Sequence, residues 1–297
     1  MPSAPHPDAS QGLLRRRLAE PAIMDLAARR RRLVLAGLLV VGSVLLFTRV
    51  WDWWLEHEDL SRLDTPLMRW LTEHRDPLVT SVLVVITTVT APTGMILISL
   101  ATVLVWLWRS THWWRPVLLA GSMLLAVTGI VGVKWIVERR RPPIADMLLG
   151  ADHSFSFPSG HTLATTTFVL VLVYLLYFRP RAVTPRFAAD DAALRSPAGA
   201  VPTSPGDHGV RQVAATTRPE PRRGRWWALL GAVTVIAVVA FSRLYLGYHW
   251  LTDVTGAFLL ALAVLGVVIG VDAWRPTAPR HRGCVAVPRG APGTTER

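Results

Sequence analysis

The stretch FPSGHTLATTTFVLVLVYLLYF, residues 157–178, joins a polar hexapeptide to an apolar run that carries no charged side chain. A helix of about 20 apolar residues is long enough to cross the hydrocarbon core of a bilayer. Proline, serine, glycine and histidine stand together where this helix would begin. The stretch therefore predicts a membrane-spanning helix with a polar group of residues at its mouth.

Five further apolar runs occur in the 297-residue chain, of which 51% is hydrophobic. Together with 161–178, the runs cover residues 33–50, 92–108, 116–137, 226–246 and 250–271. A helix satisfies its own backbone hydrogen bonds within lipid, so each run is expected to form one. We therefore predict an all-α, polytopic membrane protein built as a bundle of six transmembrane helices.

Tryptophans gather at the ends of these runs, and tryptophan prefers the boundary between membrane and water. The residues concerned are Trp51, Trp53, Trp54, Trp106, Trp108, Trp113, Trp114, Trp226, Trp227, Trp250 and Trp274. Tryptophans that served as ordinary core residues would be spread along the runs instead. Their clustering supports the predicted limits of the spans.

The formal net charge of +12 comes almost entirely from arginine. The basic residues crowd the N-terminal tail, the 109–115 turn, the 179–225 loop and the C-terminal tail. With six spans these four segments lie on one side, and the positive-inside rule assigns that side to the cytoplasm. The segment 51–76 is net acidic and falls on the opposite side. Membrane topology already explains the charge, so we expect no nucleic-acid binding.

The same patterns predict the organisation of the chain. Residues 1–30 and 276–297 are expected to be disordered cytoplasmic tails, with 31–275 forming one membrane domain. Within it, 180–225 is rich in proline, alanine, arginine and threonine, which favours a flexible cytoplasmic loop. Cys284 is the only cysteine, which leaves no intramolecular disulfide or cysteine-cluster metal site.

The segment between the first two spans, 52–91, has two parts. Leu67, Trp70 and Leu71 repeat at helical spacing shortly after Pro66, which predicts a helix lying on the membrane surface. Residues 78–91 are apolar enough to dip into the bilayer. If they formed a seventh span instead, every later element would be inverted and the arginine-rich loop would lie outside.

A first group of polar residues, KWIVERRRPP, ends the third run. Lys134 is the only lysine in the chain, and Arg141 follows seven residues later. Two helical turns separate them, so they are expected on one face of the helix, and Pro142 favours its end. Snorkelling of positive side chains to the interface is the plainer explanation. Against it, these arginines lie on the side that the positive-inside rule disfavours.

The second group is PSGH at the mouth of the fourth run. Pro158 suits a helix start, and Ser159 can cap it. Gly160 lets a ligand approach the backbone, and His161 stands in the first turn. The free N–H groups and the positive end of the helix dipole there attract an anion. Taken alone, the group could equally be a plain cap beside an interfacial histidine.

The third group, SRLYLGYHWLTD, joins the fifth and sixth runs. Arg243 ends the fifth helix, Gly247 permits a tight turn, and His249 opens the sixth. Asp253 lies four residues after His249 and is expected on the same face. A carboxylate there can fix the tautomer of the imidazole and leave the other ring nitrogen as a nucleophile or base. A polar pair between packed helices is the alternative.

The predicted topology brings the three groups to one place. The third helix ends, the fourth begins and the fifth turns into the sixth on the extracytoplasmic side. Cations, a backbone anion site and two histidines would then meet at the outer membrane surface. This set suits a tetrahedral oxyanion, above all a phosphate.

In their order and spacing the motifs resemble those of the type 2 phosphatidic acid phosphatase superfamily, integral-membrane lipid phosphatases related to vanadium haloperoxidases. The matching motifs are K-x6-RP from Lys134 to Pro142, PSGH from Pro158 to His161, and SR-x5-H-x3-D from Ser242 to Asp253. The resemblance covers roughly residues 30–275. Each motif is weak alone, and their combination is very specific.

The resemblance implies a role for each residue. His249 would attack phosphorus to form a phosphohistidine, Asp253 would orient it, and His161 would protonate the leaving oxygen. The phosphate oxygens would be held by Lys134, Arg141, Ser159, Gly160 and Arg243. No metal and no cofactor is implied, because the cations neutralise the charge.

The position at the lipid headgroups suggests a phosphate on a lipid. The near-exclusive use of arginine over lysine suggests a GC-rich bacterial genome, and therefore a bacterial cell membrane. Candidates are phosphatidic acid, phosphatidylglycerol phosphate and polyprenyl diphosphate, and Glu138, Arg139 and Arg140 could tune the choice. Three other functions stay open: phosphotransfer between lipids, a vanadate-dependent haloperoxidase, and a transporter that binds lipid phosphate without cleaving it. The nucleophile beside an aspartate argues against the transporter.

Overall fold

The computed structural model describes residues 26–178 and 222–274, and within these residues every regular element is a helix. The elements are α2 (Leu26–Glu56), the 3-10 helix η1 (Asp59–Leu63), α3 (Asp64–Glu73), α4 (Pro77–Val89), α5 (Pro92–Arg109), α6 (Trp114–Val137), the 3-10 helix η2 (Ile144–Asp146), α7 (Gly160–Tyr177), α9 (Arg222–Tyr245) and α10 (Leu251–Trp274).

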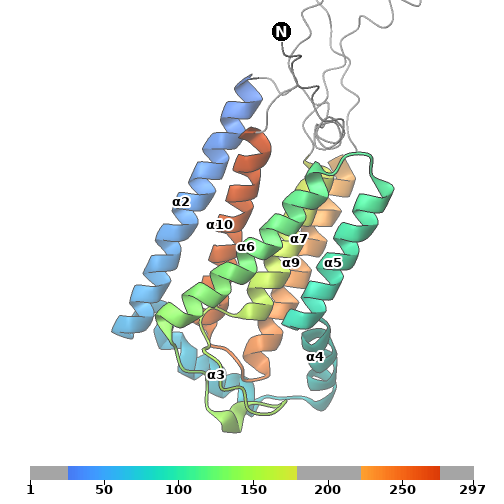
Figure 1. The fold of residues 1–297 in the computed structure, drawn as a ribbon. Helices are drawn as coiled ribbons and strands as arrows, with labels where there is room; N and C mark the ends of the chain where they lie inside the picture. The colour runs from blue at the N-terminus through green and yellow to red at the C-terminus, as the bar shows by residue number, and fades with distance from the viewer. Residues whose placement is uncertain (1–25, 179–221, 275–297) are drawn as a thin grey trace, which may run out of the picture.

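Six of the described helices are long and apolar enough to cross a membrane: α2, α5, α6, α7, α9 and α10. The predicted bundle of six transmembrane helices is confirmed. The stretch that could have formed a seventh span is α4, which has 13 residues. A helix of that length extends about 20 Å, less than the ~30 Å hydrocarbon core. It lies beside the lower ends of α5 and α9 in Figure 1.

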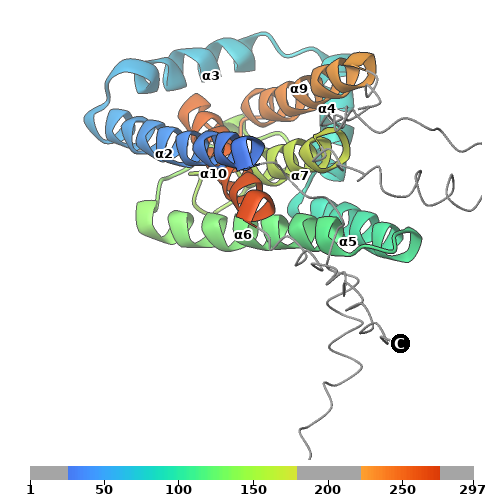
Figure 2. The same cartoon turned by 90° about the horizontal axis from the view of Figure 1, so that it is seen from above.

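Helix α10 is the centre of the bundle, packed against α2, α6 and α7 (Figure 2). Small residues let it approach its neighbours closely. A Cβ on Gly266 would lie 2.8 Å from Val40 and 3.0 Å from the Ala36 carbonyl oxygen of α2. A Cβ on Gly256 would lie 2.6 Å from the ring of Phe157, which is 1% exposed. Gly256 thus leaves room for the ring of Phe157 and lets the loop that leads into α7 pack directly on α10.

The helical limits revise several expected boundaries. Helix α2 already begins at Leu26 and runs through all three of its tryptophans to Glu56, so 26–30 is helical. Helix α9 begins at Arg222, so 222–225 belongs to it and not to the loop. The expected tails and flexible loop otherwise fall on residues 1–25, 179–221 and 275–297, outside the described residues.

The predicted helix after Pro66 is present as α3, with a different buried face. Leu71 is 3% exposed and Met68 4%, whereas Trp70 is 55% exposed. Together with α4 and the 138–159 segment, α3 covers one end of the bundle (Figure 1). The helix ends that border the undescribed segments lie at the other end.

A buried polar cluster joins four helices near that other end. Asp272 of α10 accepts hydrogen bonds from the Tyr174 hydroxyl at 2.8 Å and from Trp114 Nε1 at 2.9 Å. Arg32 Nη1 lies 3.4 Å from the same carboxylate. These contacts tie α2, α6 and α7 to the central helix.

Asp272→Ala is therefore expected to lower the free energy of unfolding by ~3 kcal/mol, the scale for breaking a buried ionic contact. Loss of the carboxylate would leave a guanidinium and two neutral donors facing the gap. Thermal unfolding in detergent measures the effect, with the exposed Asp52→Ala as the control. Equal unfolding temperatures for the two variants would show that the cluster adds nothing.

Candidate active site

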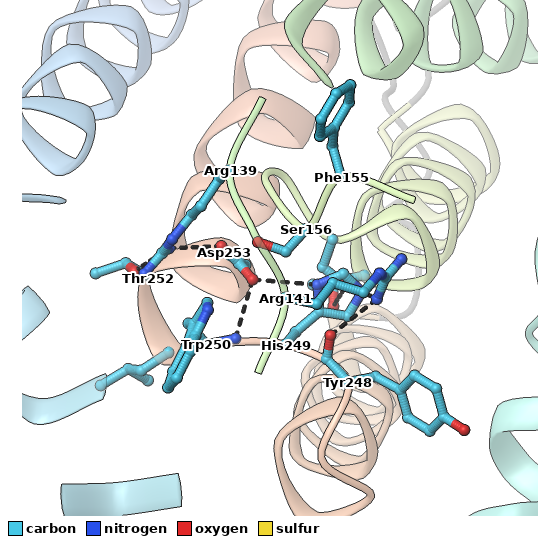
Figure 3. A network of polar contacts seen from close by, with 12 residues as sticks. Arg139, Arg141, Phe155, Ser156, Tyr248, His249, Trp250, Thr252 and Asp253 are labelled. Carbon is cyan, nitrogen blue, oxygen red and sulfur yellow. Dashed lines mark hydrogen bonds and ion pairs between the residues drawn. The ribbon is translucent and has the colours of Figure 1, made fainter. Parts of the chain in front are cut away.

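The three motifs meet at the end of the bundle that carries α3 and α4 (Figures 1 and 3). The Ser159 N–H donates to the Asp253 carbonyl oxygen at 3.2 Å, which joins the second motif to the third. Arg141 Nη1 donates to the Tyr248 carbonyl oxygen at 2.8 Å, which joins the first to the third. Residues separated by about a hundred positions in the chain thus share one site.

His249 and Asp253 form the buried centre of the site. His249 Nδ1 lies 3.2 Å from Asp253 Oδ2, and the two residues are 1% and 0% exposed. The Trp250 N–H donates to the same carboxylate oxygen at 2.9 Å. Because α10 begins only at Leu251, His249 lies in the turn before the helix and not in its first turn. The carboxylate reaches back to it across the N-terminus of α10.

The environment of His249 favours a neutral ring. Burial lowers the pKa of His249 well below its usual value, and the positive charges of Arg141, Arg243 and Lys134 lower it further. With Nδ1–H donated to the carboxylate, Nε2 keeps its lone pair. Nε2 lies 3.2 Å from Arg141 Nη1 (Figure 3). The lone pair of His249 Nε2 therefore lies against the Arg141 guanidinium.

The prediction that Lys134 and Arg141 lie on one face of a continuous helix is wrong, because no helix connects them. Helix α6 ends at Val137, and Glu138 takes a left-handed conformation with φ of 48°. The chain then turns, and both cations donate to backbone carbonyls of the same neighbouring loop. Lys134 Nζ donates to the Phe155 carbonyl oxygen, and Arg141 Nε donates to that of Ser154 at 2.9 Å.

Every nitrogen of the Arg141 guanidinium has a protein partner. Besides the contacts already described, Nη2 donates to Ser154 Oγ at 2.9 Å and pairs with Asp152 Oδ2 at 2.8 Å. Burial acts to raise the pKa of Asp152, but hydrogen bonding to Ser154 and the charge of Arg141 outweigh it and lower the pKa. An anion that binds Arg141 must displace one of these partners. Asp152 lies outside the three sequence motifs.

The mouth of α7 differs in detail from the expected cap. Ser159 occupies the position before the helix, but its side chain makes no capping bond and instead accepts one from Thr162 Oγ1 at 3.1 Å. Pro158 stands one residue further out and is not in the first turn. The first N–H groups of a helix have no acceptor within it. The N–H groups of Gly160 and His161 lie at the start of α7, beside the buried His249–Asp253 pair.

Arg243 is the third cation of the site. It contacts Thr87, a residue that the sequence did not reveal. Its side chain is buried against the ring of Tyr248, and Nη1 donates to Thr87 Oγ1 at 2.6 Å. Its Nε has no partner among the described residues. A buried N–H without an acceptor costs about 1–3 kcal/mol, which makes a bound anion favourable there.

The turn at Gly247 is as predicted. Its φ is 83°, and a Cβ would lie 2.1 Å from the Asp146 carbonyl oxygen. Only glycine fits there. The turn carries Tyr248 and His249 back over the ends of α9 and α10.

Arg139 and Asp64 are two further buried charges next to this centre. The sequence suggested Arg139, with Glu138 and Arg140, as tuning the substrate. Arg139 is 5% exposed and bonded to Asp253, whereas the other two are exposed. Asp64 lies far away in sequence, with no motif around it.

The described residues hold no group of three or more His, Cys, Asp or Glu that could bind a metal. A cavity of about 390 Å³ lies on the side of the centre that faces α2 and η1. Its lining includes Trp54, Asp64, Arg139, Arg141 and Trp250. Arg141 contacts His249 itself, and the charges of Arg243 and Lys134 also act on it, which suits an oxyanion.

Comparisons with known proteins match the part of the chain that carries the three motifs. The sequence model described as PAP2 superfamily matches residues 115–276, which contain all three motifs. Phosphatidylglycerophosphatase B of Bacillus subtilis (strain 168) is 27% identical over 139 residues. The matched region is 47% of this chain and 48% of that protein, so the chain spans about half the length of this relative.

A solved structure has the same fold. It is the crystal structure of a transmembrane PAP2-type phosphatidylglycerolphosphate phosphatase from Bacillus subtilis, and it superposes with a TM-score of 0.58. The match covers 82% of this chain and 100% of that chain, at 21% identity. At this identity the likeness concerns the fold alone.

Proposed function

The chain belongs to the PAP2 superfamily, and from that premise we propose that it is a membrane enzyme that hydrolyses the phosphate of a lipid phosphate. The observation that carries the proposal is the buried His249–Asp253 pair, whose second ring nitrogen, Nε2, lies 3.2 Å from the Arg141 guanidinium. A neutral, oriented imidazole beside an anion site is the arrangement that nucleophilic attack on phosphorus requires.

In the proposed reaction, His249 Nε2 forms a bond to phosphorus while the bond from phosphorus to the lipid oxygen breaks. His161 gives that oxygen a proton, so a lipid monophosphate is released as the alcohol and a lipid diphosphate as the monophosphate. The Asp253 carboxylate stabilises the imidazolium that forms at His249. Water then attacks the phosphohistidine, its proton passes to His161, and inorganic phosphate leaves.

Lys134, Arg141 and Arg243 hold the phosphate oxygens in this proposal, together with Ser159 and the amide of Gly160. Donors fixed before the reaction stabilise the charge that develops in the transition state without reorganisation. The Nε of Arg243, which has no partner within residues 26–178 and 222–274, supports its part in the set. The chain's own residues supply each step.

The site is proposed to face the extracytoplasmic side of a bacterial cell membrane, with both termini in the cytoplasm. The arginine-rich segments attach to the end of the bundle opposite the site, which fits the positive-inside rule. The relative named phosphatidylglycerophosphatase B makes phosphatidylglycerol phosphate the first substrate to test.

The experiment is phosphate release by the purified full chain in nanodiscs, assayed with phosphatidylglycerol phosphate, phosphatidic acid and a polyprenyl diphosphate. We expect release from at least one of these lipids without added metal, and inhibition by orthovanadate. Binding of all three without release of phosphate would overturn the proposal and favour a transporter.

Asp152→Asn is expected to tighten inhibition by orthovanadate a few-fold, the scale of a partly exposed ion pair. The wild-type carboxylate competes with the anion for Arg141, and the amide competes less. Inhibition constants at one pH measure the effect, with Asp146→Asn in the same loop as control. Weaker inhibition would show instead that Asp152 prepares Arg141 for the anion.

Gly160→Ala tests the approach of the anion to the backbone. A Cβ at residue 160 would meet only Ile130 Cδ1, at an ordinary 3.5 Å, so the bundle itself has room for it. We expect an unchanged unfolding temperature and orthovanadate inhibition weakened about tenfold, which corresponds to ~1.4 kcal/mol. Gly129→Ala in α6 is the matched control. Unchanged inhibition would remove Gly160 from the anion site.

A further inference from the structure

We propose that Asp64 and Arg139 are positioning residues that fix the Asp253 carboxylate behind His249. This inference rests on the proposed phosphatase function and deepens it. Neither residue takes part in the reaction steps given above. Both are buried charges, 5% exposed in each case, and a buried charge is rarely kept without a partner or a task.

The two oxygens of Asp253 have separate partners. Oδ2 accepts from His249 and from the Trp250 N–H, at 3.2 and 2.9 Å. Oδ1 is held by Arg139 Nη1 at 2.6 Å (Figure 3). The guanidinium therefore fixes the oxygen that His249 leaves free, and with it the rotation of the whole carboxylate.

Arg139 is itself held on every side. Its Nη2 pairs with Asp64 Oδ2 at 2.7 Å, and its Nη1 also donates to Thr252 Oγ1 at 2.6 Å. Its guanidinium carbon lies 5.3 Å from the ring centroid of Trp54 and 5.7 Å from that of Trp250. The planar guanidinium can stack on aromatic rings and bridge two carboxylates at the same time. A lysine ammonium does not offer this combination.

Asp64 connects the pair to the start of α10. Its Oδ1 accepts from the Thr252 N–H at 3.0 Å, and its Oδ2 accepts from the Thr252 hydroxyl at 2.7 Å. A side chain from α3 thus satisfies an N–H in the first turn of α10, which no residue within that helix can do. The turn that bears His249 and Asp253 is anchored to α3 through this contact.

The charges suit the proposed reaction. Two carboxylates and one guanidinium leave one negative charge next to a neutral His249. When His249 bonds to phosphorus and its ring becomes cationic, that charge is balanced. Without Arg139, the two buried carboxylates would lose the one cation that contacts both of them in the described residues. Without Asp64, Arg139 would neutralise the charge of Asp253, and no negative charge would remain next to His249.

The cavity next to Arg139 suggests a different role, contact with the substrate headgroup. The two roles predict different kinetics. A positioning residue acts on the reaction step and lowers kcat at constant KM, whereas a headgroup contact raises KM.

The test uses the full chain in nanodiscs and compares Asp64→Asn and Arg139→Gln with wild type. The substrate is whichever lipid phosphate the wild type hydrolyses. We expect kcat to fall about tenfold or more, as for residues that orient a reacting group from behind. KM and the orthovanadate inhibition constant should stay within about twofold. The double variant should lose no more than Arg139→Gln, because the residues act as one unit.

Arg62→Gln is the matched control, because it breaks an exposed pair with Glu58 in the neighbouring η1 helix. Should a charge variant fail to fold, Thr252→Val decides, since it removes the hydroxyl shared by both residues and keeps their charges. A raised KM with unchanged kcat, or unchanged kcat in Thr252→Val and in every folded charge variant, overturns the inference. A wild type that releases no phosphate overturns the proposed function instead.

Discussion

His249→Ala is expected to lower kcat for phosphate release at least ~10³-fold, the scale on which loss of a nucleophile acts. The alanine variant keeps the cations and the mouth of α7, so it should still bind orthovanadate. Among the described residues, no other side chain takes the place of the His249 imidazole as a neutral nucleophile in this variant. The residual rate would then come from water attacking a phosphate that the cations hold.

Trapping of a phosphoenzyme gives an independent measurement. Acid-labile, base-stable label from a radioactive lipid phosphate should appear on the wild-type chain and be absent from His249→Ala. His74→Ala, an exposed histidine on α3, is the control and should retain both label and turnover. Near-normal turnover in His249→Ala would reject the assignment of the nucleophile.

Much of the fold follows from the sequence because hydropathy and charge are local quantities. Each apolar run could be measured against the thickness of a bilayer, and six runs fix which helix ends share a side. That count alone brings together the end of α6, the mouth of α7 and the α9–α10 turn. The limits of α2 were harder to predict, because its basic first turn and tryptophan-rich last turns are not apolar.

The contacts around the site could not be predicted in the same way. The pairing of Lys134 with Arg141 was inferred from helical spacing, but α6 ends four residues before Arg141. Their shared position depends on backbone carbonyls of a returning loop, which no spacing rule describes. Thr87 belongs to a stretch whose only clear signal is apolarity. Its contact with Arg243 exists only because α4 packs on α9.

Asp64 is the clearest example of a residue beyond the reach of sequence patterns. It lies 188 residues from Thr252 and 75 from Arg139, and nothing near it repeats a motif. A lone carboxylate at the start of a surface helix is usually read as a cap. Its burial against a guanidinium becomes visible only when α3 is placed across the end of the bundle.

His161→Asn is expected to lower kcat for a lipid phosphate by about 10²–10³-fold, within the range for loss of a general acid. The alcohol of a lipid is a poor leaving group, because its oxygen must gain a proton as the bond to phosphorus breaks. Asparagine keeps a polar side chain of similar size but cannot donate a proton to the leaving oxygen as an imidazolium can.

An aryl phosphate separates acid catalysis from binding, because a nitrophenolate leaves without a proton. With p-nitrophenyl phosphate, His161→Asn should retain far more of the wild-type kcat than with the lipid substrate. His249→Ala should lose turnover on both substrates, since both need the nucleophile. An equal loss on both substrates in His161→Asn would mean that the ring holds the phosphate and does not protonate the leaving group. The difference between the two histidine variants thus distinguishes attack on phosphorus from departure of the lipid, the two halves of the proposed phosphoryl transfer.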